Sequence, residues 1–197
     1  MPTEGPVVVI GTSSGGLVAL REMFGAMPED FNAPIAITMH IGDRSLLPEL
    51  LSTASPFPAR FAKEGDLLIP GAVLIAPPGS HLLIGNGVVH LGHGAKENYC
   101  RPAIDPMFRS AAFSYRERAI AVLLTGELDD GTVGAQAVKS CGGVVVVQDP
   151  AEAESPSMPR SALDFFQVDH CLKLRAISPQ LSELIRTSSE RPNKNVS

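Results

Sequence analysis

The sequence contains no tryptophan and only 5% aromatic residues, so a buried core has to be built mainly from aliphatic side chains. Its three cysteines, Cys100, Cys141 and Cys171, are far apart and form no C-x-x-C pair. An odd number of cysteines without paired spacing argues against a disulfide framework and against a structural zinc site. We therefore expect reduced thiols, no metal and a cytoplasmic location.

The chain also lacks an apolar run long enough to cross a bilayer. Its first residues, MPTEGPVVVIG, do not have the basic segment and long apolar run of a signal peptide. Neither membrane insertion nor a signal peptide is expected. The 16 Lys and Arg residues form no cluster, and 21 acidic residues give a net charge of -5. These features disfavour binding to nucleic acid or to an anionic membrane.

The length of 197 residues, 44% of them hydrophobic, is enough for one domain with a substantial core. Short runs rich in Val and Ile alternate with stretches of helical spacing, which is typical of an α/β fold with a doubly wound, mostly parallel sheet. Strands are predicted at residues 7–10, 34–40, 119–124 and 144–148, and helices at 17–27, 46–51, 105–118, 133–140, 163–166 and 177–185.

The middle and the end of the chain have a different character. Short apolar segments lie between residues 57 and 91, and a GNG turn at 85–87 predicts a small antiparallel hairpin there. Residues 92–104 predict an irregular loop that is longer than most connections, and such loops often carry function. The polar end predicts a disordered tail at 187–197, which leaves residues 1–186 as one domain.

The first predicted strand runs into a Gly-rich corner, IGTSSGG. This corner lacks the second glycine of a dinucleotide fingerprint and the lysine of a Walker loop, although a helix start can still bind phosphate through its N–H groups. It does contain G-x-S-x-G with Ser13 at the centre, in the strand–turn–helix context of a serine nucleophile. The alternative is that Ser13 or Ser14 simply caps the following helix.

A serine nucleophile needs a base, and the imidazole of histidine is suited to that role. Of the five histidines, His40 ends the second predicted strand, so Ser13 and His40 are expected at the same carboxyl edge of the sheet. The stretch LTGELDDG places Glu127, Asp129 and Asp130 after a further strand at that edge. A carboxylate there can orient the base, whereas helix capping is the alternative role for either aspartate.

Together these segments resemble the catalytic domain of the chemotaxis protein-glutamate methylesterases, the CheB family. The family's signature segments are matched by IGTSSGG, ITMHI, APPGSHL, an R-P-x-x-D-x-x-F pattern, LTGELDDG and, in part, SMPR. The matches occur in the family's order and cover roughly residues 6–175. The resemblance implies a serine esterase that hydrolyses glutamyl methyl esters on chemoreceptor helices and releases methanol. Related enzymes also deamidate receptor glutamines.

The resemblance assigns the nucleophile to Ser13, the base to His40 and the orienting acid to Asp130, in a chain order that differs from the Ser–Asp–His order of α/β-hydrolases. It implies no metal and no organic cofactor. The N–H groups that face the developing oxyanion are expected near Ser14, Gly15 and Gly16, with a further one from the Glu127 corner.

Three departures from the family pattern bear on this interpretation. The chain starts almost at the first catalytic strand, without the receiver domain of the common two-domain enzyme, so control by phosphorylation within the same chain is not expected. Glu127 stands where the family often has Met, and its carboxylate is expected either to favour the protonated imidazole of His40 or to repel an acidic receptor helix. Ser14 replaces Thr and keeps the hydroxyl.

The expected partners are the cytoplasmic helices of methylated chemoreceptors, with a separate response regulator or methyltransferase as further candidates. Arg101 and Arg160 are candidates for binding acidic flanks of such a helix, and a structural salt bridge within the loop is an equal alternative. Two competing hypotheses remain for the whole chain. One is a signalling module that docks a helix without turnover, and the other is a phosphate binder at the first corner.

Overall fold

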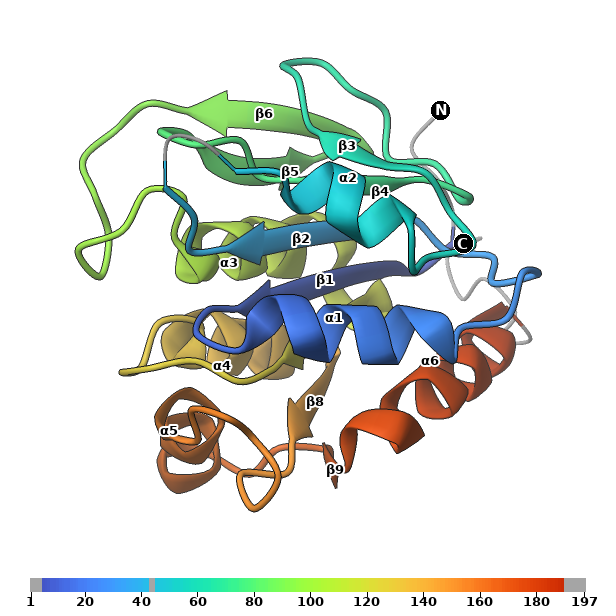
Figure 1. The fold of residues 1–197 in the computed structure, drawn as a ribbon, viewed down its shortest axis with the longest axis vertical. Coiled ribbons are helices and arrows are strands. Elements are labelled where there is room, and N and C mark those ends of the chain that lie inside the picture. Colours follow the sequence, from blue (N-terminus) through green and yellow to red (C-terminus); the bar gives the residue numbers. More distant parts are fainter. Residues whose placement is uncertain (1–4, 43–44, 190–197) are drawn as a thin grey trace, which may run out of the picture.

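The computed structural model describes residues 5–42 and 45–189 (Figure 1). Its centre is a seven-stranded sheet in the order β3-β4-β2-β1-β7-β8-β9, with every neighbouring pair parallel. The predicted doubly wound parallel sheet is therefore confirmed. The strands are β1 (Val7–Thr12), β2 (Ile35–Met39), β3 (Ala59–Phe61), β4 (Val73–Ile75), β7 (Ala119–Leu123), β8 (Val144–Gln148) and β9 (His170–Leu172).

Helices cover both faces of the sheet, and the side chains of β1 show how the two faces are divided (Figure 1). Val8 and Ile10 belong to one apolar layer and Val7 and Val9 to the other, because successive side chains of a strand point to opposite faces. A strand buried on both faces has no polar side, which explains the unbroken VVVI run. The first layer contains α1 (Gly16–Gly25), α2 (Leu47–Ser52) and α6 (Leu174–Ser189), and the second contains α3 (Ile104–Tyr115), α4 (Thr132–Ser140) and α5 (Ser157–Phe165).

The predicted hairpin is present as a separate two-stranded antiparallel sheet of β5 (His81–Gly85) and β6 (Val88–Gly92). Its turn places Asn86 and Gly87 at φ values of 52° and 78°, the left-handed conformation that such a tight turn requires. The hairpin packs on α3 through hydrogen bonds between the backbone of Ile84 and the hydroxyls of Ser110 and Ser114. The neighbouring short strands β3 and β4 join the parallel sheet instead.

The C-terminal helix is longer than the sequence predicted. It continues to Ser189, so residues 187–189, which were predicted to be part of a disordered tail, are helical. The helix continues although the apolar pattern has ended, and in its last turn the hydroxyls of Thr187 and Ser188 bond back to the carbonyls of Glu183 and Leu184. The rest of the predicted tail lies outside the described residues.

The strand order brings three carboxyl ends together at the centre of the sheet. β1 lies between β2 and β7. The strands that follow β1 up to β4 lie on the β2 side of it, whereas β7, β8 and β9 lie on the other side. Ligands of open α/β sheets bind at such a switch point, outside the carboxyl ends of the strands. No helix in the part of the chain that the structure describes is long and apolar enough to span a bilayer.

Candidate active site

Ser13 is held by the backbone at the carboxyl end of β1. Its N–H donates to the carbonyl of Thr125 at 3.0 Å, which continues the pairing of β1 with β7 one step beyond the strands. The next residues turn sharply into α1, whose N-cap is Gly15 at a left-handed φ of 76°. A side chain at that position would also approach the Cβ of Glu154 within 2.8 Å. Glycine is therefore required for the turn that presents the serine.

The capping role considered for the two serines is wrong. The N-cap position belongs to Gly15, and no side chain forms a capping hydrogen bond to α1. The Ser13 hydroxyl instead contacts the ring of His40, with 3.0 Å between Oγ and Nδ1. The side chain is only partly buried, so a substrate can reach it.

His40 follows β2 directly and lies between Ser13 and Asp130. The backbone N–H of His40 donates to the carbonyl of Thr12 at 3.3 Å, and the ring nitrogen Nε2 lies 2.7 Å from Oδ2 of Asp130. An ionised carboxylate only accepts hydrogen bonds, so Nε2 carries the hydrogen and Nδ1 is left to accept from the Ser13 hydroxyl. The two ring nitrogens thus exchange the positions they have in the chymotrypsin triad.

Asp130 is only 2% exposed, and four donors surround its carboxylate. Oδ2 also accepts from the N–H of Ile104 at 2.7 Å, whereas Oδ1 accepts from the N–H of Asp105 at 3.1 Å and from Nδ2 of Asn98 at 2.7 Å. Burial by itself favours the neutral acid, but the hydrogen bonds from His40, Ile104 and Asn98 outweigh it and hold the pKa of Asp130 below its usual value. This carboxylate therefore stays charged beside the imidazole at neutral pH.

A second buried carboxylate, that of Asp105, lies beside Asp130. Its Oδ1 accepts from the N–H groups of Gly131 and Gly134 at 3.1 and 2.6 Å, and its Oδ2 accepts from Nδ2 of Asn98 at 2.9 Å. Each aspartate thus bonds to the start of the other's helix: Asp130 to the first turn of α3, and Asp105 to the start of α4. Burial raises the pKa of Asp105 above its usual value despite these hydrogen bonds.

Sequence reasoning placed Asp105 in the R-P-x-x-D-x-x-F segment without giving it a role, and it did not single out Asn98. An acidic residue in the first turn of a predicted helix was a readable signal for Asp105, because carboxylates are favoured at helix N-termini. Nothing in the sequence around Asn98 marks it, since its two partners are 7 and 32 residues away along the chain.

Of the residues predicted to stabilise an oxyanion, some have a backbone N–H that already donates a hydrogen bond, and others have one that is available. The N–H of Gly16 donates to the carbonyl of Ser13 at 2.9 Å and is already used. Ser14, Gly15 and Glu127 form no backbone N–H hydrogen bond to any other described residue. The Glu127 corner adjoins Ser13, since a Cβ on Gly126 would lie 2.9 Å from the Cβ of Ser13. Two separate segments therefore offer donors beside Ser13.

Ser13, His40 and Asp130 border a pocket of about 250 Å³. Two large side chains stand at its rim, Tyr99 at 91% exposed and Leu128 at 68% exposed, and both sit on left-handed backbone with φ of 63°. Such a conformation is unfavourable for bulky residues and is concentrated at functional sites. The pocket is lined by Ser13, His40, Asn98, Tyr99, Cys100, Glu127, Leu128, Asp129 and Asp130.

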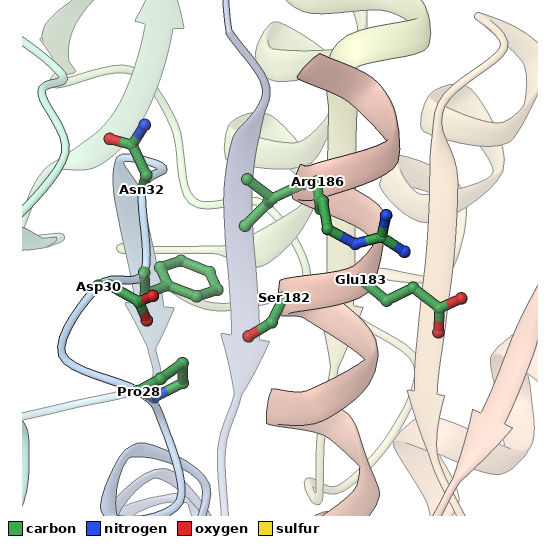
Figure 2. A pocket seen from close by; sticks show the side chains of 8 residues that line it. Pro28, Asp30, Asn32, Ser182, Glu183 and Arg186 are labelled. Atoms are coloured by element: carbon green, nitrogen blue, oxygen red, sulfur yellow. The ribbon is translucent and has the colours of Figure 1, made fainter. Parts of the chain in front are cut away.

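Another hollow, of about 620 Å³, lies at the other end of the sheet, beyond the amino end of β2 (Figure 2). Asp30 and Asn32 of the loop before β2 border it on one side, and Ser182, Glu183 and Arg186 of α6 border it on the other. It contains none of the residues around Ser13 and His40.

Comparison with known proteins identifies the fold and the family. The model of the CheB methylesterase family matches residues 8–181, which is most of the chain. The chain belongs to the CheB methylesterase family.

Individual relatives agree with this assignment. The chain is similar to protein-glutamate methylesterase/protein-glutamine glutaminase 2 of Anaeromyxobacter dehalogenans, at 41% identity over 91% of this chain and 53% of that protein. A Leptospira interrogans relative is 36% identical over 93% of this chain and 97% of its own length. The crystal structure of the Thermotoga maritima CheB methylesterase catalytic domain superposes with a TM-score of 0.88 at 36% identity, covering 93% of this chain and 100% of that chain.

The chain thus spans about half the length of the Anaeromyxobacter protein and nearly all of the Leptospira protein. The resemblance drawn from the sequence segments is confirmed, and so is the predicted fold class. No group of three or more His, Cys, Asp or Glu side chains is arranged to hold a metal ion within residues 5–42 and 45–189.

The structure separates the two arginines singled out within the CheB-like segments. Arg101 does not line the pocket, and its Nη1 donates to the carbonyls of His93 and Gly94, so its guanidinium ties the 92–104 loop together. Arg160 borders a shallow neighbouring groove that shares Leu128 and Asp129 with the pocket. Of the two, only Arg160 borders a hollow that adjoins the pocket.

Proposed function

We propose that this CheB-family chain is a serine esterase that hydrolyses glutamyl methyl esters on the cytoplasmic helices of methylated chemoreceptors. The observation that carries the proposal is the hydrogen-bonded series from Ser13 through His40 to Asp130, with contacts of 3.0 and 2.7 Å. The activity in the name of the Anaeromyxobacter relative supports the choice of substrate. Because such helices are cytoplasmic, we infer that the chain acts in the cytoplasm.

The first half of the reaction forms an acyl-enzyme. Nδ1 of His40 takes the proton of the Ser13 hydroxyl as Oγ attacks the ester carbonyl carbon, and the carbonyl oxygen becomes an oxyanion. The available N–H groups of Ser14 and of the Glu127 corner are the donors proposed for this oxyanion. The C–O bond to the methoxy group then breaks, and the leaving methoxide takes the proton from His40 and departs as methanol.

The second half regenerates the serine. His40 accepts a proton from water as the water oxygen attacks the acyl carbon, and Oγ of Ser13 leaves and takes that proton back. The product is a glutamate side chain. Asp130 keeps the hydrogen of the imidazole on Nε2 and stabilises the cation that forms in each half. Its lowered pKa ensures that the stabilising charge is present at neutral pH.

The rim of the pocket suits a neutral ester better than the charged product. Glu127 and Asp129 are exposed at this rim, so a glutamate carboxylate formed beside Ser13 meets like charges. Tyr99 and Leu128 offer apolar surface for the helix that carries the ester. The same chemistry with ammonia as the leaving group gives glutamine deamidation, which the name of the Anaeromyxobacter relative also includes.

The test is methanol release from receptor-helix fragments that carry γ-methyl glutamate. Ser13→Ala should abolish release and leave the circular dichroism spectrum unchanged. Ser188→Ala, a serine on the far end of α6, is the matched control and should release methanol at the wild-type rate. Unchanged release by Ser13→Ala would overturn the esterase proposal, whereas tight binding of the fragment without release by the wild type would favour the docking module.

A further inference from the structure

One side-chain nitrogen serves both buried carboxylates next to the imidazole. Nδ2 of Asn98 lies 2.9 Å from Oδ2 of Asp105 and 2.7 Å from Oδ1 of Asp130. An amide nitrogen has two hydrogens, so it donates one to each carboxylate. No other side chain in the described residues forms hydrogen bonds to both aspartates.

This arrangement addresses an electrostatic problem. The two aspartates are 5% and 2% exposed, and their oxygens lie within two hydrogen-bond lengths of each other because they share one donor. Two carboxylates that close repel each other, and such a pair tends to take up a proton. The charged or titratable groups that face the pair are the imidazole of His40, the thiol of Cys100 and the guanidinium of Arg109.

The pair divides its charge unequally. The pKa of Asp130, which contacts His40, is lowered, whereas burial raises the pKa of Asp105. Any proton taken up by the pair therefore resides on Asp105 as long as the donors to Asp130 remain in place. The hydrogen bond from Asn98 lowers the pKa of both carboxylates, so its removal makes each of them easier to protonate. A proton on Asp130 would neutralise the charge that His40 needs.

The backbone holds Asn98 in position for this contact. Asn98 has a left-handed φ of 48°, a conformation that asparagine and glycine tolerate better than other residues. The flanking residues Glu97 and Cys100 exchange backbone hydrogen bonds of 3.2 and 2.8 Å across the turn. Glu97 also forms an ion pair of 2.6 Å with Arg109 of α3, so the turn is anchored to the helix that Asp130 caps.

We propose that Asn98 is a positioning residue for the esterase reaction: by donating one amide hydrogen to each of Asp130 and Asp105, it keeps Asp130 ionised and turned toward His40. Asn98 acts through Asp130 and takes no part in bond making. The proposal rests on the proposed function for its kinetic consequence, but its electrostatic consequence is measurable in the absence of turnover.

The test uses Asn98→Gly, which removes the amide and keeps the left-handed backbone. We expect kcat for the methylated fragment to fall about tenfold while KM changes less than about twofold, because a hydrogen bond to a charged group is lost and the apolar rim of Tyr99 and Leu128 remains. Asn86→Gly is the matched control. Asn86 is also exposed on left-handed backbone, at φ 52°, but lies in the hairpin turn away from the pocket. It should leave kcat unchanged.

The pH dependence separates positioning from a merely structural effect. Turnover needs an imidazole of His40 that can accept a proton and an ionised Asp130, and in the wild type the lowered pKa of Asp130 keeps its protonation from limiting the acid side. In Asn98→Gly the aspartate pair should titrate at higher pH, as followed by the carboxyl ¹³C resonances of labelled protein. The acid side of the pH profile should then steepen from one proton toward two.

A double variant tests the role of the second carboxylate. Asn98→Gly/Asp105→Asn removes the repulsion that the amide offsets, so its kcat should exceed that of Asn98→Gly. An unchanged carboxyl titration and an unchanged kcat in folded Asn98→Gly would overturn the proposal. Failure of the esterase proposal would be seen separately, as methanol release that does not depend on Ser13, and the carboxyl titration would still decide the role of Asn98.

Discussion

The isosteric change Asp130→Asn tests the central contact of the site most directly. The four donors around the carboxylate of Asp130 make the orientation of the new amide predictable. If the amide nitrogen replaced Oδ1, it would face two donors, the N–H of Asp105 and Nδ2 of Asn98. If it replaced Oδ2, it would face the N–H of Ile104 alone, because Nε2 of His40 can give up its hydrogen and accept instead.

The second orientation has fewer donor–donor conflicts and should therefore predominate. It moves the imidazole hydrogen to Nδ1, where it points at the Ser13 hydroxyl and prevents Nδ1 from accepting the proton. The same change in the chymotrypsin-type triad lowers kcat about 10⁴-fold for this reason. We expect kcat for methanol release to fall by about 10³- to 10⁴-fold. One unsatisfied buried donor should also lower the free energy of unfolding by about 1–3 kcal/mol.

The assay is single-turnover methanol release at saturating fragment, with urea unfolding measured on the same preparation. Asp66→Asn is the matched control, since Asp66 also accepts from a backbone N–H, that of Lys63, and from a cation, Arg60, but lies outside the pocket. It should keep full turnover. A kcat for Asp130→Asn within about tenfold of the wild type would refute the assignment of Asp130 as the carboxylate that orients His40.

Two further outcomes follow from the structure. Gly15→Ala should lower the free energy of unfolding by about 1–3 kcal/mol, because φ is 76° and the new Cβ meets Glu154. Gly65→Ala is the control, because Gly65 has φ 81° and no atom near its added Cβ, so its loss of unfolding free energy measures the backbone strain alone. An equal loss of unfolding free energy in both variants would contradict a steric contribution from Glu154. The lowered pKa of Asp130 means that the folded chain binds fewer protons there than the unfolded chain. The contribution of Asp130 to stability is therefore present above about pH 4 and is lost as the pH falls further. In urea unfolding, the difference in free energy of unfolding between wild type and Asp130→Asn should become smaller below about pH 4.

The positions of the main strands and helices could be predicted because the signals are local. The VVVI run of β1 and the VVVV run of β8 are apolar throughout, and the helices between them show apolar residues at helical spacing. The boundaries were less accurate where side chains bond back to the helix, as at Thr187, or where short strands such as β3 are decided by a neighbouring strand.

The amino-acid sequence by itself determined a parallel sheet and a serine, a histidine and an aspartate at three strand ends. Parallel strands share one carboxyl edge, so residues that follow β1, β2 and β7 had to lie at the same side of the molecule.

Only the tertiary structure decided which ring nitrogen of His40 faces Ser13, that Asp105 lies beside Asp130, and that Asn98 joins the two carboxylates. The physical reason is that a hydrogen bond requires donor and acceptor within about 3 Å at a defined angle. The packing of α3 against α4 and the path of the 92–104 loop set that geometry, and residues far apart along the chain leave no local pattern that records it.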